Sequence, residues 1–114
     1  MLTVDSLKDF GANTDEGLAR CFNKADFYLR LVKTVPAEGN FQRLADALAA
    51  NDLDAAFESA HALKGVLSNL SLTPISRPVS EMTELLRART QTDYSALLAE
   101  TLKQRDALKA LCEE

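Results

Sequence analysis

The chain has 114 residues, of which 46% are hydrophobic and 26% are charged, and its formal net charge at pH 7 is −4. This length and composition allow one domain, residues 1–114, built around a single core. Acidic and basic residues are interspersed, and the apolar runs are far shorter than the ~20 residues of a membrane span, so we expect neither nucleic acid nor a membrane as a partner.

The first 24 residues predict two short helices. Apolar residues recur at three-residue spacing in the first helix: Val4, Leu7 and Phe10. Gly11 is suited to end this helix. Asn13 or Thr14 caps the second helix, which is expected to end near Asn23. The apolar residues of the second helix are Leu18, Cys21 and Phe22.

Residues 25–50 predict one long amphipathic helix with a defect in its middle. Its apolar positions are Phe27, Leu31, Val35, Phe41, Leu44 and Leu48. Pro36 and Gly39 interrupt this pattern, so we expect either a kink or a brief break there. Asn51 and Asp52 form the following turn, and Asp52 is a candidate cap for the next helix.

Three further helices follow. The first runs to about Leu70, with a core stripe of Leu53, Ala56, Ala60, Leu63, Leu67 and Leu70. Because Pro74 and Pro78 resist a helix interior, the second is expected to become regular only at about Ser76, and it continues to about Arg89. After a turn at residues 91–93, a final helix of about five turns begins near Tyr94.

The predicted fold is all-α. Helical spacing recurs throughout, no useful stretch alternates as a strand would, and short connections favour antiparallel neighbours. We therefore expect an up-down-up-down antiparallel four-helix bundle with a short N-terminal helical segment. Cys21 and Cys112 are far apart and no signal segment opens the chain, which indicates a reduced, cytoplasmic protein. Nothing in the sequence supports a dimer, so a monomer is expected.

The only histidine of the chain, His61, lies in the middle of the fourth predicted helix. At about 100° per residue, His61, Lys64, Gly65 and Ser68 share one strip of this helix. The core stripe is centred well to one side of that strip. We therefore expect His61 to face outward, with Lys64 and Phe57 at the margin.

The residue types of this strip fit phosphoryl chemistry. A neutral imidazole is a nucleophile near physiological pH, and Lys64 can stabilise the charge of a phosphoryl group. Gly65 removes a side chain beside the imidazole, at a cost of about 1 kcal/mol in a helix interior. Ser68 is small, so it keeps the approach open. Each residue alone has an ordinary explanation, as a surface histidine, a solvated lysine or a close-packing glycine, and only their combination favours a site.

The stretch AHALKGVLSNL, with its His-x-Leu-Lys-Gly core, resembles the histidine-containing phosphotransfer (HPt) domain family. The segments GLARCFNKADFYLRLV and ALAANDLDAAFESAH are also similar to the family pattern. The resemblance implies that His61 is phosphorylated through Nε2, that Lys64 assists transfer and that Gly65 leaves space for a receiver domain. Two positions depart from the pattern: Ser71 replaces a common glycine, and Pro78 replaces a core apolar residue.

These observations predict a phosphorelay intermediate without kinase activity. His61 is expected to accept a phosphoryl group from a receiver aspartate and to pass it to another. The partners are therefore receiver domains and possibly a hybrid sensor kinase. No glycine-rich nucleotide loop is present and no acidic cluster lies beside His61, so no cofactor is expected. Phe57, Thr83 and Arg87 are the candidate docking surface, although Arg87 is more readily explained as an ordinary exposed arginine.

Two alternatives differ in class from a phosphoryl carrier. A helical interaction module would use the same face without phosphorylation, and it would keep its function after His61→Gln. A metal enzyme is disfavoured because one histidine and two distant cysteines make no recognisable zinc set, so no metal site is expected.

Overall fold

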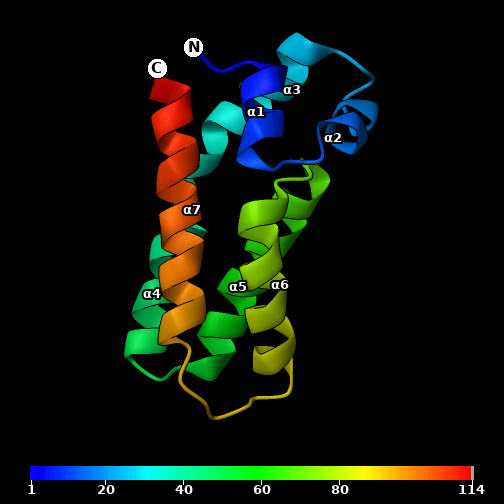
Figure 1. Ribbon diagram of the computed structural model, residues 1–114. Helices are drawn as coiled ribbons and strands as arrows, with labels where there is room; N and C mark the ends of the chain where they lie inside the picture. Colours follow the sequence, from blue (N-terminus) through cyan, green and yellow to red (C-terminus); the bar gives the residue numbers. More distant parts are fainter. Residues whose placement is uncertain (114) are drawn as a thin grey trace.

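The computed structural model describes residues 1–113, which contain helices and no strand (Figure 1). The elements are α1 (Val4–Phe10), α2 (Thr14–Arg20), α3 (Ala25–Thr34), the 3-10 turn η1 (Val35–Ala37), α4 (Asn40–Ala49), α5 (Leu53–Asn69), α6 (Thr73–Arg87) and α7 (Ser95–Glu113). The prediction of an all-α chain is confirmed.

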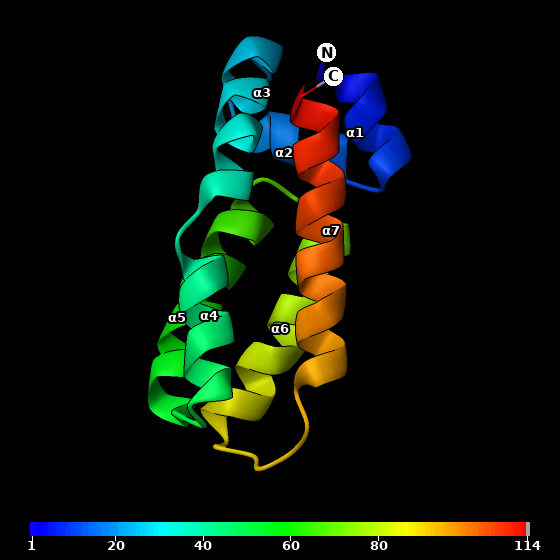
Figure 2. The ribbon, with the colours of Figure 1, turned by 90° about the vertical axis from the view of Figure 1, so that its left-hand side faces the viewer.

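Helices α4 to α7 form the elongated body of the molecule. Helix α5 packs against both α4 and α6, and α6 packs against α7. Figure 1 shows the chain reversing its direction after α4, after α5 and after α6. In the view turned by 90°, α3 continues upward beyond α4, and α1 and α2 lie at the end of the body where both termini are found (Figure 2).

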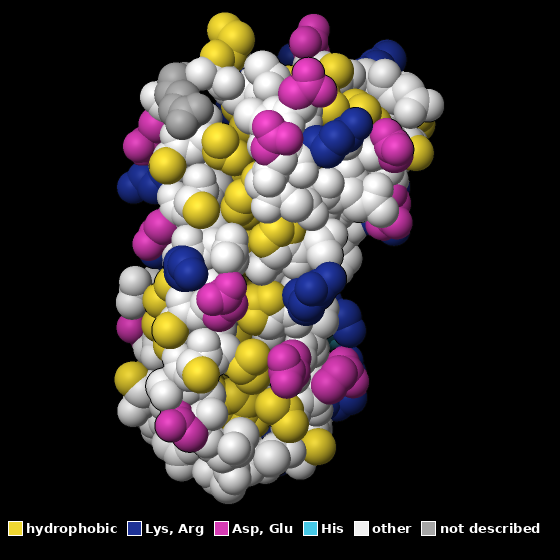
Figure 3. Space-filling view, viewed as in Figure 1, with side chains coloured by type: hydrophobic (Ala, Val, Ile, Leu, Met, Phe, Trp, Pro, Cys, Tyr) yellow, Lys and Arg dark blue, Asp and Glu magenta, His cyan; other side chains and the backbone are white. Residues whose placement is uncertain are grey.

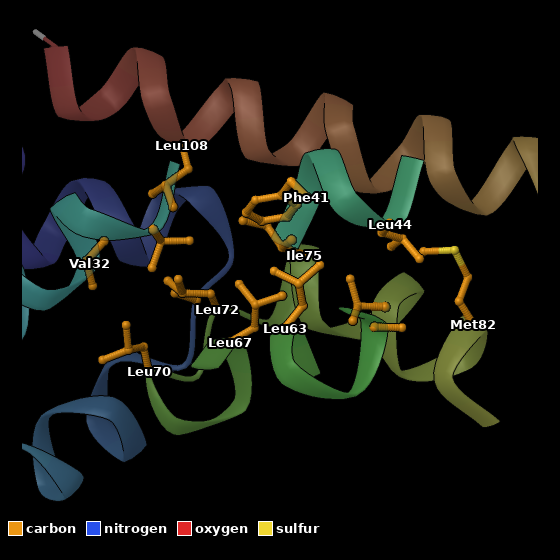
Figure 4. Close-up of a cluster of buried hydrophobic side chains, with 14 of the residues drawn as sticks. Val32, Phe41, Leu44, Leu63, Leu67, Leu70, Leu72, Ile75, Met82 and Leu108 are labelled. Atoms are coloured by element: carbon orange, nitrogen blue, oxygen red, sulfur yellow. The ribbon is translucent and has the colours of Figure 1, made fainter. Parts of the chain in front are cut away.

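The core lies between these helices and explains why they associate. Its largest fully buried side chains include Phe41, Leu44, Leu63, Leu67, Ile75, Met82 and Leu108 (Figure 4). Burying such a side chain contributes about 1.5–3 kcal/mol, which is more than the intrinsic helix preference of any residue other than proline. On the face shown in Figure 3, apolar atoms continue between α6 and α7, where Pro74, Pro78 and Leu97 line a groove of about 470 Å³.

The helix predicted over residues 25–50 is broken at Pro36, one of the two outcomes that the sequence left open. Helix α3 ends at Thr34, and Pro36 lies in the single turn η1, where a residue without an N–H group is tolerated. Glu38 is then extended, and α4 begins at Asn40. After this break, α3 extends beyond the end of α4 (Figure 2).

Two expectations about helix boundaries were wrong. Helix α6 begins at Thr73 rather than near Ser76, because Pro74 occupies the first turn, where no helical partner for its N–H is needed. Pro78 stays inside α6 and is buried. Helix α2 ends at Arg20, so Phe22 is not on its apolar face; Phe22 has a left-handed φ of 59° and is 78% exposed.

The N-terminal helices are tied to the C-terminal end of α5. The Tyr28 hydroxyl on α3 donates a hydrogen bond to the Leu70 carbonyl, at 2.9 Å. On α2, the Arg20 guanidinium donates to the carbonyl of Ser68 and, at 3.2 Å, to the hydroxyl of Ser71. Tyr28 thereby provides a donor for a carbonyl at the helix end, where intrahelical N–H donors run out, and Arg20 adds a donor to the Ser68 carbonyl, which also accepts from the Ser71 N–H at 3.1 Å. One end of α5 is therefore held from outside the four-helix body.

Candidate functional site

His61 lies on the outward side of α5. The helix starts where the Asp52 side chain accepts a hydrogen bond from the Ala55 N–H, at 3.1 Å, as the sequence predicted. The opposite side of α5 is buried through Ala56, Ala60, Leu63 and Leu67. His61 is exposed, and within residues 1–113 none of the hydrogen bonds found engages its imidazole. In the described residues, no hydrogen bond therefore competes for either ring nitrogen.

An aromatic contact supports the imidazole from one turn earlier on α5. The rings of Phe57 and His61 are 5.4 Å apart between centroids and tilted by 39°. The guanidinium groups of Arg87 and Arg89 lie over the Phe57 ring, at 5.1 Å and 5.2 Å from its centroid. Phe57 is partly buried. The sequence placed Phe57 and Arg87 near His61, but it did not identify Arg89.

Lys64 belongs to a three-residue cluster that joins α5 to α6. Its Nζ lies 3.3 Å from Glu84 Oε2, and Arg87 Nε lies 3.4 Å from Glu84 Oε1. The hydrogen bond from Arg87, followed by that from Lys64, lowers the pKa of the Glu84 carboxyl below its ordinary value. Glu84 therefore carries its negative charge at neutral pH. Glu84 was not among the residues predicted from the sequence, although Arg87 three residues later on the same helix was a local signal.

Gly65 opens the surface beside the histidine. A Cβ built at Gly65 would meet no atom within 4 Å, so the glycine is not required for packing between helices. The explanation as a close-packing glycine is therefore wrong. Gly65 also lines a shallow hollow of about 400 Å³ with Leu31, Thr34, Val66, Asn69 and Leu70. Ser68 is exposed further along the strip, and its carbonyl is held by Arg20.

Thr83 does not belong to the surface around His61. It is fully buried, and its hydroxyl donates a hydrogen bond to the Val79 carbonyl, at 2.7 Å. The expectation that Thr83 contributes to a docking surface is therefore wrong. The reason is a rotation of about 100° per residue along α6, which directs Thr83 into the core and Glu84 toward α5.

Residues 1–113 show neither a metal-binding cluster nor a membrane-spanning helix. In this part of the chain, no three histidine, cysteine, aspartate or glutamate side chains gather in a way that could hold a metal ion. No helix of these residues is long and apolar enough to cross a membrane. Cys21 is buried and Cys112 half-buried, and both are free thiols.

The family comparison agrees with the local geometry. Residues 36–114 match the model of the Hpt domain. Comparison with curated proteins and with solved structures gave no match. Hpt domains act in histidine phosphotransfer within phosphorelays, interact with receiver domains and kinases, and are phosphocarriers rather than kinases. Because the match spans well over half of the chain and includes the whole of α5, the chain belongs to the Hpt domain family.

Proposed function

We propose that His61 accepts a phosphoryl group from an aspartyl phosphate on one receiver domain and passes it to an aspartate on another. In the first step, the lone pair of His61 Nε2 attacks phosphorus, and a P–N bond forms while the P–O bond to the aspartate breaks. The bonding pair returns to the aspartate as a carboxylate. The second step is the same displacement in reverse, so the phosphoryl bond is passed on without ATP.

The observation that carries this proposal is the exposure of His61 beside an open Gly65. An in-line displacement needs the donor, phosphorus and Nε2 to lie on one axis, with a bulky receiver domain behind the donor. A side chain at position 65 would stand beside this approach. The glycine costs about 1 kcal/mol of helix stability relative to alanine, and access to His61 explains why it is kept.

Lys64 and Arg87 supply positive charge for the phosphoryl oxygens. Both side chains are partly exposed, at 36% and 51%, and both are long enough to reorient. The receivers would bring the divalent metal ion and the acidic residues, and this chain would contribute a positioned nucleophile with no kinase activity of its own. The up-down-up-down arrangement of the four-helix body would hold α5 with its histidine side outward.

We place the docking surface on Phe57, Arg87 and the residues around Gly65. This surface combines a partly buried aromatic ring with cationic edges, as transient protein interfaces commonly do. Because two receivers must bind in turn, the contact should be small and short-lived. We propose that the chain acts as a monomer in the cytoplasm, where the thiols of Cys21 and Cys112 stay reduced.

Phosphoryl transfer from a labelled receiver tests the proposal. The protein is incubated with a receiver domain carrying ³²P on its aspartate, and we expect label on His61 that is labile in acid and stable in alkali. His61→Gln should abolish the label while circular dichroism shows an unchanged helical fold. Label that persists in His61→Gln would contradict the proposal. Receiver binding without any label would instead favour the interaction module.

A further inference from the structure

We propose that Glu84 is a positioning residue that holds Lys64 and Arg87 while His61 is unphosphorylated and competes with the phosphoryl group for both cations afterwards. This inference rests on the proposed phosphorylation of His61. As a consequence, Lys64 and Arg87 bind the phosphoryl group on His61 less tightly than they would without Glu84. This suits a carrier that must pass its phosphoryl group on.

The geometry places one carboxylate between two cations. Each oxygen of Glu84 has its own partner, since Oε2 bonds Lys64 and Oε1 bonds Arg87. Lys64 comes from α5 and the other two residues come from α6, so the cluster bridges the helix that carries the histidine and its neighbour. Arg87 also lies over Phe57, whose ring contacts His61. Both cations are thus linked to the imidazole through short contacts or one helical turn.

The bonds of the cluster are suited to exchange. Glu84 is 58% exposed, and bonds between exposed charges are weak and screened by salt. A phosphoryl group offers three oxygens and a charge near −2 at neutral pH, so it is a stronger ligand for a lysine or arginine than one carboxylate. The cations should therefore move toward the phosphoryl group. Glu84 remains nearby and ionised, and it opposes this movement.

Other charged groups near His61 already have partners or belong to the same helix. Arg89, whose guanidinium also lies over Phe57, is paired with Asp54 near the start of α5. Glu58 is exposed three residues before His61 on α5. Glu84 differs from both because it bonds two cations of the His61 surface at once.

The proton affinity of the phosphoryl group measures this competition directly. The protein is phosphorylated with phosphoramidate, whose zwitterion ⁺H₃N–PO₃²⁻ transfers its phosphoryl group to Nε2 while NH₃ leaves with the bonding pair. The phosphoryl pKa is then read from the ³¹P chemical shift as a function of pH. In Glu84→Gln the freed cations favour the dianion, and we expect the proton affinity to fall by about threefold to tenfold.

Glu81→Gln is the matched control. It removes the same charge from the same helix, one turn earlier, where Glu81 lines the groove between α6 and α7 and not the His61 surface. We expect less than a twofold change in this variant. Equal changes in the two variants would overturn the inference and leave the proposed function standing.

A double-mutant cycle tests whether Glu84 acts through the cations. In a Lys64→Gln/Arg87→Gln background, the effect of Glu84→Gln should fall to less than half. An undiminished effect would show that the charge of Glu84 acts by itself, and the positioning role would be wrong. If the wild-type protein acquires no phosphoryl group on His61, both the inference and the proposed function fail together.

Discussion

Gly17 and Gly65 are both glycines inside helices, but their surroundings are opposite. A Cβ at Gly17 of α2 would lie 2.6 Å from the ring and hydroxyl of Tyr28, so this glycine lets two helices touch. A Cβ at Gly65 of α5 would meet nothing within 4 Å. The first glycine is explained by packing inside the molecule. Packing does not explain the second, which agrees with its proposed role in giving a receiver domain access to His61.

The two glycines correspond to two regions of α5 that differ in the same way, its C-terminal end and its middle. The C-terminal end is anchored, because Tyr28 and Arg20 bond its last carbonyls and the ring of Tyr28 fills the space above Gly17. The middle, around His61 and Gly65, is open to solvent. A fixed end and an exposed centre suit the proposed role of His61 as a nucleophile, because the imidazole must keep its orientation while partners bind and dissociate.

Gly17→Ala should have the largest effect on stability. The new methyl group cannot be accommodated by a small movement, because Tyr28 is fully buried and its hydroxyl is bonded to the Leu70 carbonyl. Overpacking of this kind typically costs 1–3 kcal/mol, and we expect a loss of about 3 kcal/mol in the free energy of unfolding. Urea unfolding followed by circular dichroism measures it. A loss below about 0.5 kcal/mol would show that α2 is not held tightly against α3.

The Tyr28 contact should also make stability sensitive to alkali. Burial is the main cause that raises the pKa of Tyr28 to about 12, with an electrostatic contribution from nearby Cys21 as a second cause. Because the pKa is higher in the folded than in the unfolded state, the contribution is complete below pH 10 and is lost as pH rises from 10 to 12. We expect wild type to lose about 2 kcal/mol more than Tyr28→Phe over this range. Parallel pH dependences of the two proteins would contradict this.

Gly65→Ala should change stability in the other direction. Alanine has the higher helix propensity and its methyl group meets no atom, so we expect the free energy of unfolding to rise by up to about 1 kcal/mol. Chemical denaturation of wild type and variant measures the change. A stabilised variant would show that Gly65 is kept at the expense of the fold.

Larger side chains at position 65 sharpen the same comparison. Gly65→Gln should remain folded but slow phosphoryl transfer from a receiver domain by about tenfold or more, since the side chain obstructs docking. Transfer from phosphoramidate should change little, because this donor is small. Equal slowing with both donors would place the defect at the imidazole rather than at the docking surface.

The sequence predicted the helices, an interruption at Pro36 that could be a kink or a break, and the outward direction of His61, because these depend on local spacing and on proline geometry. It could not predict contacts that depend on how helices pack. It therefore placed Thr83 on the surface where Glu84 stands, one residue and about 100° away. It also could not distinguish a crowded glycine from an open one, since both occupy helix interiors.

Ser71 should show the smallest effect, because two contributions oppose each other. Its φ of 55° is left-handed, which costs a residue with a Cβ about 1–2 kcal/mol. Its hydroxyl donates to Glu16 at 2.9 Å and accepts from Arg20 at 3.2 Å, and these bonds offset the strain. Ser71→Gly loses the bonds and relieves the strain, so we expect it within about 0.5 kcal/mol of wild type.

Ser71→Ala separates the two contributions, because it loses the same hydrogen bonds and keeps the Cβ in the left-handed conformation. We expect it to be about 1 kcal/mol less stable than Ser71→Gly in urea unfolding. Equal stabilities of the two variants would mean that the turn relaxes and that no strain exists there. A lower stability of Ser71→Ala than of Ser71→Gly would instead show how a serine is kept after the anchored end of α5, where the family pattern commonly has a glycine. The hydrogen bonds to α2 offset the strain of the left-handed backbone at Ser71.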